Sequence, residues 1–283
     1  MESTTPASNP LLTETVDHLR SLMGPEMDRI TVERAVIGIF FSGIKLSNGE
    51  GGICFTPVKE IPQAVCCPSS ARAMPNSGKL VGQTVGYHID HMHSGGPLQK
   101  ALGIAVLNAL SSTCWRQQPP TDYRLLNGLD PVENRTIDDD AEVVVIGALV
   151  PYFRALKSRK KPFTILEKDP RTLKPDEMQF FVPQERANER IASADLMIIT
   201  GTTLINNTLD GILAQMKPGA DAVLVGPTAS MLPDAFFSRG VSSIGGIRVT
   251  DADRLLDTLA EAGSGYHFYG KSADRLVIEN HAN

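Results

Sequence analysis

The segment ITGTTLINNTLDG, residues 199–211, concentrates hydroxyl and amide side chains between an apolar run and a helical run. A single capping side chain is enough to begin a helix. Thr202, Thr203 and Asn206 exceed that requirement, and such a cluster favours contact with a polar ligand. Asn207 is open to two interpretations, the N-cap of the following helix or a ligand contact.

Small or acidic residues follow the other apolar runs of the C-terminal half in the same way. In an open parallel sheet, ligands bind outside the carboxyl ends of the strands, near the point where the strand order reverses. Each of these residues would let a ligand approach backbone N–H groups or would offer it an acceptor. We therefore expect one ligand-binding rim, formed by Gly147, Glu167, Asp169, Thr200, Gly201, Thr202, Asn206, Asn207, Gly226, Pro227 and Thr228.

Glu167 has a specific candidate role within this rim. It lies 20 residues after Gly147, the spacing at which nucleotide-binding folds place an acid that accepts hydrogen bonds from ribose hydroxyls. A solvated carboxylate at a strand end is the alternative. The segment GALVPY has one glycine where the dinucleotide fingerprint has three, which argues against NAD or FAD. Catalytic residues stay unassigned, with Glu167, Asp169 and Asp251 as the candidates for acid–base work.

Three imidazoles and one carboxylate lie close together in the segment YHIDHMH, residues 87–93. His88, His91 and His93 could ligate a soft or borderline metal ion if they converge. In a helix, His88 and His91 would share a face, whereas in a strand His91 and His93 would do so. Since no single regular element aligns all three, a solvated polar loop is the alternative interpretation.

Five apolar runs without polar alternation recur along the second half of the chain, with helical segments between them. This pattern predicts a parallel sheet covered by helices on both faces. We therefore expect residues 121–283 to form a Rossmann-like, doubly wound α/β domain. The five runs are AEVVVIG, PFTILEKD, ADLMIITG, DAVLVGP and VSSIGG.

The first half of the chain has a different pattern, and residues 1–120 are expected to form a separate α+β domain. Short runs of Val, Ile and Phe between residues 29 and 57 predict two or three antiparallel strands. Turns are expected at Ser42-Gly43 and at Asn48-Gly49. An apolar periodicity then predicts a long helix from Leu98 to Trp115.

Composition and charge narrow the function classes. The chain has 283 residues, of which 42% are hydrophobic and 21% charged, and its formal net charge is −5. These values are typical of a globular protein, and they indicate no basic face for nucleic acid. No apolar run is long enough to cross a bilayer, so we expect a cytoplasmic protein with its four cysteines reduced. The expected partner is a small-molecule or metal-complex ligand, and formation of a homo-oligomer is left open.

Longer segments resemble one known family. LEKDP, TGTTLINNT and GPTA, together with the Gly-Gly pair and the Val-Thr-Asp triplet of residues 245–251, are similar to the heavy-metal-chelation family. GGICFTP and LGIAVLNAL also look like the first domain of that family. The resemblance implies an enolase N-terminal-like α+β domain followed by a Rossmann-like domain.

The resemblance also implies a site between the two domains, where the first domain closes over the Rossmann crevice. On that basis Asn108 and Thr56 are candidate ligand contacts from the first domain. The implied function is binding or chemical conversion of a pterin-, flavin- or siderophore-like molecule linked to heavy-metal chelation. One alternative is a non-catalytic protein that binds a metal or metal complex. Another is an S-adenosylmethionine-binding, methyltransferase-like protein, in which Glu167 meets the ribose. The cofactor is accordingly unknown, with a divalent metal ion and a nucleotide-like ligand as the two classes considered.

Overall fold

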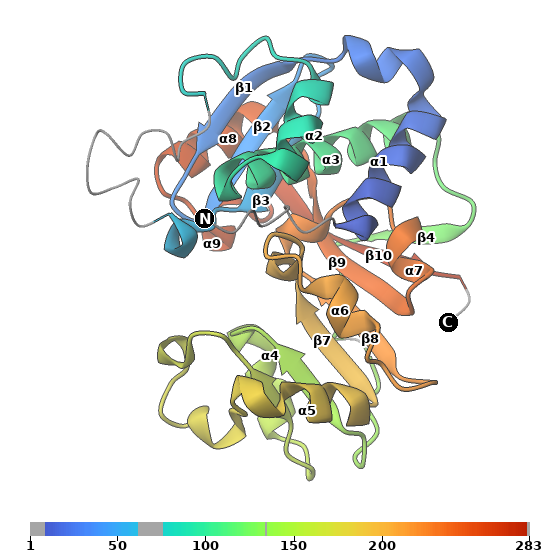
Figure 1. Ribbon diagram of the computed structural model, residues 1–283, viewed down its shortest axis with the longest axis vertical. Coiled ribbons are helices and arrows are strands. Elements are labelled where there is room, and N and C mark those ends of the chain that lie inside the picture. The colour runs from blue at the N-terminus through green and yellow to red at the C-terminus, as the bar shows by residue number, and fades with distance from the viewer. Residues whose placement is uncertain (1–8, 62–75, 134, 282–283) are drawn as a thin grey trace, which may run out of the picture.

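Seven strands form the larger of the two sheets, in the order β4-β10-β9-β8-β7-β5-β6 (Figure 1). The five strands from β9 to β6 are parallel, and β10 is antiparallel to both of its neighbours. This computed structural model describes residues 9–61, 76–133 and 135–281. The strands are β4 Tyr123–Asn127, β5 Val143–Ile146, β6 Thr164–Leu166, β7 Leu196–Thr200, β8 Asp221–Val225, β9 Val241–Val249 and β10 Ala273–Asn280.

Short helices follow the parallel strands, as expected of a doubly wound α/β domain. The central strands are buried on both faces because their side chains are apolar without alternation. The predicted α/β fold with a doubly wound parallel sheet is confirmed. The helices of this domain are α4 Val150–Lys157, α5 Ala187–Ser193, α6 Leu209–Leu213, α7 Asp234–Phe237, α8 Ala252–Ala260 and α9 Gly265–Phe268.

The smaller sheet is an antiparallel meander that lies between two helices. Helix α3 packs against it from the first domain, and α8 packs against it from the second. A Cβ atom on Gly52 would lie 2.1 Å from the carbonyl oxygen of Ala105, so this glycine lets the α3 backbone lie directly on β3. The elements are α1 Pro10–Met23, β1 Val32–Ile37, β2 Phe41–Leu46, β3 Gly51–Phe55, α2 Val85–Ser94 and α3 Pro97–Gln117.

The two domains share one apolar core, which contains side chains of α1 and α3 together with side chains of β7, β8 and β9. Helix α3 is buried along most of its length, as expected of a helix that is apolar on all sides. Within the described residues, no helix combines the length and apolar character needed to cross a bilayer. The division between residues 120 and 121 stays a prediction, and β4 begins at Tyr123.

One predicted turn is wrong, and two strands were not predicted. Ser42-Gly43 lies inside β2 and not in a turn. A Cβ atom on Gly43 would lie 2.8 Å from a Leu256 methyl group and 2.9 Å from a Leu259 methyl group, so this glycine gives α8 room to approach the sheet. The unpredicted strands, β4 and β10, extend the parallel sheet at one edge.

Candidate functional site

Three predicted rim residues lie in a row at the carboxyl ends of adjacent strands. β5 is in register with β6 on one side and with β7 on the other. At the end of β5 the Gly147 N–H donates to the carbonyl oxygen of Leu166 at 2.9 Å. Glu167, Gly147 and Thr200 therefore stand next to one another. The strand order reverses at β5, so this row lies at the position where doubly wound folds bind ligands.

Gly147 is required at this position for two reasons. Its φ angle is +103°, a conformation that residues with a side chain rarely adopt. A Cβ atom would also lie 2.7 Å from Cγ2 of Thr200, closer than carbon atoms pack. The ends of β5 and β7 thus approach each other closely, and no side chain projects from the backbone at the reversal point.

The end of β6 carries two carboxylates with different surroundings. Glu167 is half-buried, and one of its oxygens accepts the Asp169 N–H at 2.9 Å. Asp169 pairs with Arg171 at 2.7 Å and with Lys59 at 2.7 Å. These two cations hold the pKa of the Asp169 carboxyl well below its usual range. Asp169 is therefore always ionised near neutral pH and is unsuited to act as a general acid.

Lys59 shows how the first domain reaches the rim. It belongs to the short 3-10 helix η2, Val58–Glu60, which follows β3 after a few residues. The Lys59 ammonium meets Asp169 of the second domain. This contact places η2 beside the end of β6, on the same edge of the sheet as the row of Glu167, Gly147 and Thr200.

Most polar groups of the segment TGTTLINNT stabilise the segment itself. Thr203 Oγ1 donates to the carbonyl oxygen of Thr200 at 2.7 Å, and Thr202 Oγ1 lies 3.2 Å from Thr200 Oγ1. The Asn206 side chain accepts from the Thr208 N–H at 3.2 Å and from the Thr208 hydroxyl at 2.6 Å. These bonds shape the turn after β7, and they leave Thr200 and Thr202 half-buried at the rim.

Asn207 does not cap the helix that follows it. Thr208 occupies the N-cap of α6, and Asn207 has a positive φ of 58°. Its side-chain oxygen accepts a hydrogen bond from Asn9 at 3.0 Å and another from the ammonium group of Lys100. The capping interpretation is therefore wrong, and Asn207 instead joins the rim loop to α1 and α3.

Lys100 is a rim residue that the sequence analysis missed. It lies in the first turns of α3 and is half-buried, and burial lowers the pKa of its ammonium group. Among the described residues, Asn207 is the one hydrogen-bond partner of the Lys100 ammonium group. An ammonium group carries three donors, so two remain for water or a ligand. The only sequence signal was a lysine inside an otherwise apolar helix.

Asn108, Thr56 and Thr228 are each at most 3% exposed. Asn108 Nδ2 donates to the carbonyl oxygens of Ile53 at 2.8 Å and Thr228 at 3.1 Å. The Thr228 hydroxyl accepts a backbone N–H of β3 at 3.1 Å, and Thr56 is hydrogen-bonded to Ser42 at 2.9 Å. Asn108 and Thr228 thus join the domains, whereas the Thr56 bond lies within the first domain, and we do not retain these side chains as ligand contacts. Gly201, Gly226 and Pro227 lie in the same region, on the turns after β7 and β8.

The three histidines of residues 87–93 lie on α2 and do not converge. His88 is 2% exposed, and burial lowers its pKa. His91 is bonded through Nδ1 to the carbonyl oxygen of Tyr87 at 2.7 Å. His93 is half-buried, and its pKa is lowered by burial and by nearby Lys100. In the part of the chain that the structure describes, no three His, Cys, Asp or Glu side chains are arranged to hold a metal ion.

The cysteines whose positions are described are also unsuited to bind a metal readily. Cys54 and Cys114 are buried and free. Burial raises the pKa of both thiols, in the case of Cys114 to about 11. Because the thiolate is the form that ligates metals, these thiols are weak candidates. Cys66 and Cys67 lie outside the described residues.

Comparison with known proteins assigns the family. Two family models, both described as "putative heavy-metal chelation", match residues 20–111 and residues 130–278. The chain belongs to this heavy-metal-chelation family. Two family proteins of unknown function have similar solved structures. The protein from Pyrococcus horikoshii is 19% identical with a TM-score of 0.73, and the protein from Desulfitobacterium hafniense is 17% identical with a TM-score of 0.67. In both cases the match covers 95% of this chain and 99% of the other.

A further relative is an uncharacterized protein from Methanocaldococcus jannaschii. It is 31% identical over 179 residues, which are 62% of this chain and 64% of that protein. The solved structures show the fold of the family member described here. The family's description implies a metal, but the described residues offer no three-ligand set that fits a bare ion.

Proposed function

We propose that this family member binds a small chelator, free or as its metal complex, at the carboxyl edge of β6, β5 and β7. The observation that carries the proposal is the row of Glu167, Gly147 and Thr200 at the point of strand reversal, with two cations of the first domain bonded to the loops that follow β6 and β7. The cations are Lys59, on the β6 side, and Lys100, on the β7 side.

The chemistry of the rim supports a ligand with both hydroxyl and anionic oxygen groups. A Glu167 carboxylate accepts hydrogen bonds from hydroxyl groups, and Gly147 beside it adds no side chain that would block a ligand. The spare donors of Lys100 suit a carboxylate, phosphate or deprotonated chelating oxygen. Siderophore-like molecules carry both kinds of group, and pterin- and flavin-like molecules belong to the same proposed range.

A complexed metal fits the described residues better than a bare ion does. Chelation of a bare ion needs converging His, Cys, Asp or Glu side chains, and the described residues lack such a set. A chelator supplies those donors itself, and the protein then has only to recognise the chelator.

A nucleotide-like ligand, including S-adenosylmethionine, is the second candidate. This candidate is supported by the position of Glu167. It follows β6, the second parallel strand in chain order, and lies directly beside Gly147. That is the position from which an acid reaches ribose hydroxyls in nucleotide-binding folds. The two candidates differ in the metal dependence of binding, because only a chelator changes its charge and shape when it takes up a metal.

A thermal-shift screen tests the proposal directly, since a ligand that binds the folded state raises its apparent stability. The screen covers siderophore-type chelators with and without Fe³⁺, pterins, flavins, S-adenosylmethionine and free metal ions. For each hit we expect Glu167→Gln and Lys100→Met to weaken binding about tenfold or more, as for a lost charged hydrogen bond.

The matched controls are Glu261→Gln and Lys160→Met. Glu261 is exposed with no side-chain partner in the described part of the chain, and Lys160 makes one exposed ion pair with Asp139. Both controls are expected to bind as the wild type does. Wild-type affinity of every hit for both rim variants would refute the site.

A further inference from the structure

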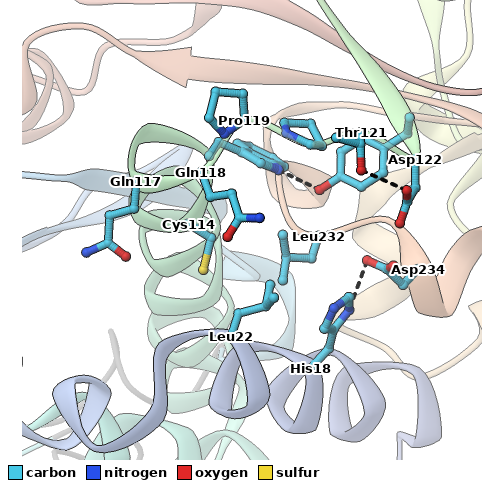
Figure 2. Close-up of a pocket in the computed structure, with 13 residues that line it drawn as sticks. His18, Leu22, Cys114, Gln117, Gln118, Pro119, Thr121, Asp122, Leu232 and Asp234 are labelled. Carbon is cyan, nitrogen blue, oxygen red and sulfur yellow. Dashed lines mark hydrogen bonds and ion pairs between the residues drawn. The ribbon is translucent and has the colours of Figure 1, made fainter.

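A cavity of about 240 Å³ lies at the other edge of the large sheet, away from the rim. Figure 2 shows it between α1, the end of α3 and the segment that leads into α7. Tyr123, on its wall, is paired with Asn280 in β10, next to the amino end of β9. The rim is formed by the carboxyl ends of the parallel strands, so the cavity is a separate site.

The wall of this cavity is acidic. Asp122 and Asp234 contribute carboxylates, and none of the lysines and arginines whose positions are described lines it. His18 Nδ1 lies 3.0 Å from a carboxylate oxygen of Asp234, and the Asp234 carboxylate has no other donor among the described residues. Burial raises the pKa of Tyr123 to about 12, and Asp234 and Asp122 contribute in the same direction. Both carboxylates therefore exert an electrostatic effect on Tyr123, which lines the cavity.

A rigid aromatic pair forms another part of the wall. Trp115 Nε1 donates to the Tyr123 hydroxyl oxygen at 2.8 Å, and the two side chains are 7% and 9% exposed. The Tyr123 hydroxyl has no acceptor for its own proton within the described residues. Leu22 and Leu232 add apolar side chains to the lining, near the His18–Asp234 contact (Figure 2).

We propose that this cavity binds a small organic ammonium ion, with its charge toward Asp122 and Asp234 and its apolar part against the aromatic wall. Aromatic faces and carboxylates together attract organic cations. The described lining holds no lysine or arginine, so His18, paired with Asp234, is the one basic side chain there that can oppose the carboxylate charge. The carboxylates and the Cys114 thiol do not form a three-ligand metal set. The cavity volume equals the liquid volume of about eight water molecules, which suits a ligand of about nine non-hydrogen atoms.

The chain has a built-in reporter for this site, because Trp115 is its one tryptophan. We would titrate the full chain with 2-phenylethylammonium, with the neutral isostere 2-phenylethanol and with phenylacetate, and follow tryptophan fluorescence. A saturable change is expected with the ammonium ion. Binding of the alcohol is expected to be about tenfold weaker, as for a lost charge-assisted contact, and no response to the carboxylate is expected.

Two variants locate the charge effect. Asp234→Asn is expected to weaken ammonium binding about tenfold and to leave the weak binding of the alcohol unchanged. Asp122→Asn changes an exposed side chain, so this variant should fold. It tests the contribution of carboxylate charge to ammonium binding if Asp234→Asn fails to fold. Asp274→Asn, an exposed aspartate with no side-chain partner in the described residues, is the matched control and should bind as the wild type does.

Three results would overturn the assignment. They are equal responses to the ammonium ion and the alcohol, unchanged ammonium binding in both folded aspartate variants, and a fluorescence response to Zn²⁺ or Ag⁺ at concentrations where the ammonium ion has no effect. These outcomes are independent of the rim. Failure of the ammonium-binding proposal would therefore leave the chelator proposal untouched, and the reverse also holds.

Discussion

Gly147→Ala should destabilise the protein strongly, although it adds only one methyl group. A φ of +103° costs a residue with a side chain about 1–3 kcal/mol. The new Cβ would lie 2.7 Å from Cγ2 and 3.0 Å from Cβ of Thr200. Overpacking of this kind costs about 1–3 kcal/mol more. We therefore expect the free energy of unfolding to fall by about 2–6 kcal/mol.

The two parts of this cost can be separated. Thr200→Ser removes Cγ2 and keeps the hydroxyl, so the double variant relieves the closer contact and retains the backbone strain. The double variant should be about 1 kcal/mol more stable than the sum of the single changes predicts, within the usual range for residues in contact. Urea unfolding followed by circular dichroism gives the four free energies of this cycle.

Gly211→Ala is the matched control for the same substitution. Gly211 lies in α6 with a φ outside the positive range, and a Cβ there meets nothing within 4 Å. Alanine is favoured over glycine in helices by about 0.5–1 kcal/mol, so this variant should be as stable as the wild type or slightly more stable. Exposed substitutions usually change the free energy of unfolding by no more than about 0.5 kcal/mol. If Gly147→Ala changes it by no more than that, the account of the strand reversal is wrong.

Two further predictions concern the contacts that hold the rim in place. Asn108→Ala removes the donor shared by carbonyl oxygens of both domains. Urea unfolding should show that the free energy of unfolding falls by about 2–3 kcal/mol, as for buried groups left unpaired. A decrease smaller than that of an exposed substitution would contradict the role of Asn108 in joining the domains. The depressed pKa of Asp169 contributes stability that is present above its ordinary pKa of 3.8 and is lost as the pH falls through the lower folded-state pKa. Below pH 3.8 the wild type should therefore lose stability more steeply than Asp169→Asn, and parallel curves in an acid titration of unfolding would contradict the pairing with Lys59 and Arg171.

The parallel sheet and the rim were predictable because both depend on short-range patterns. Runs such as VVVI and LMIIT are apolar without alternation, and this signals strands buried on both faces. The rim follows from the general rule that such strands end on one edge. β4 was not predicted because it is an edge strand with partly exposed residues, and its sequence, YRLLN, lacks a clear period.

The errors have a common cause in contacts between distant parts of the chain. Gly43 was taken for a turn residue, but it is needed because α8, more than 200 residues later, lies against its strand. Asn108 was expected to contact a ligand because the family resemblance implies a site between the domains, and its partners prove to be backbone carbonyls of both domains. Lys100 was overlooked because Asn207 becomes its neighbour only in the folded chain.

The contact between the domains bears directly on how the rim can bind a ligand. One core includes side chains of both domains, and the buried bonds of Asn108 cross between them. Separating the domains would expose that core, so the position of Lys100 relative to Asn207 is set by folding and not by the ligand. A preformed site loses less entropy when it binds. The proposed chelator would therefore meet Glu167, Gly147 and Lys100 already in place, and its affinity would depend on its own charge and shape.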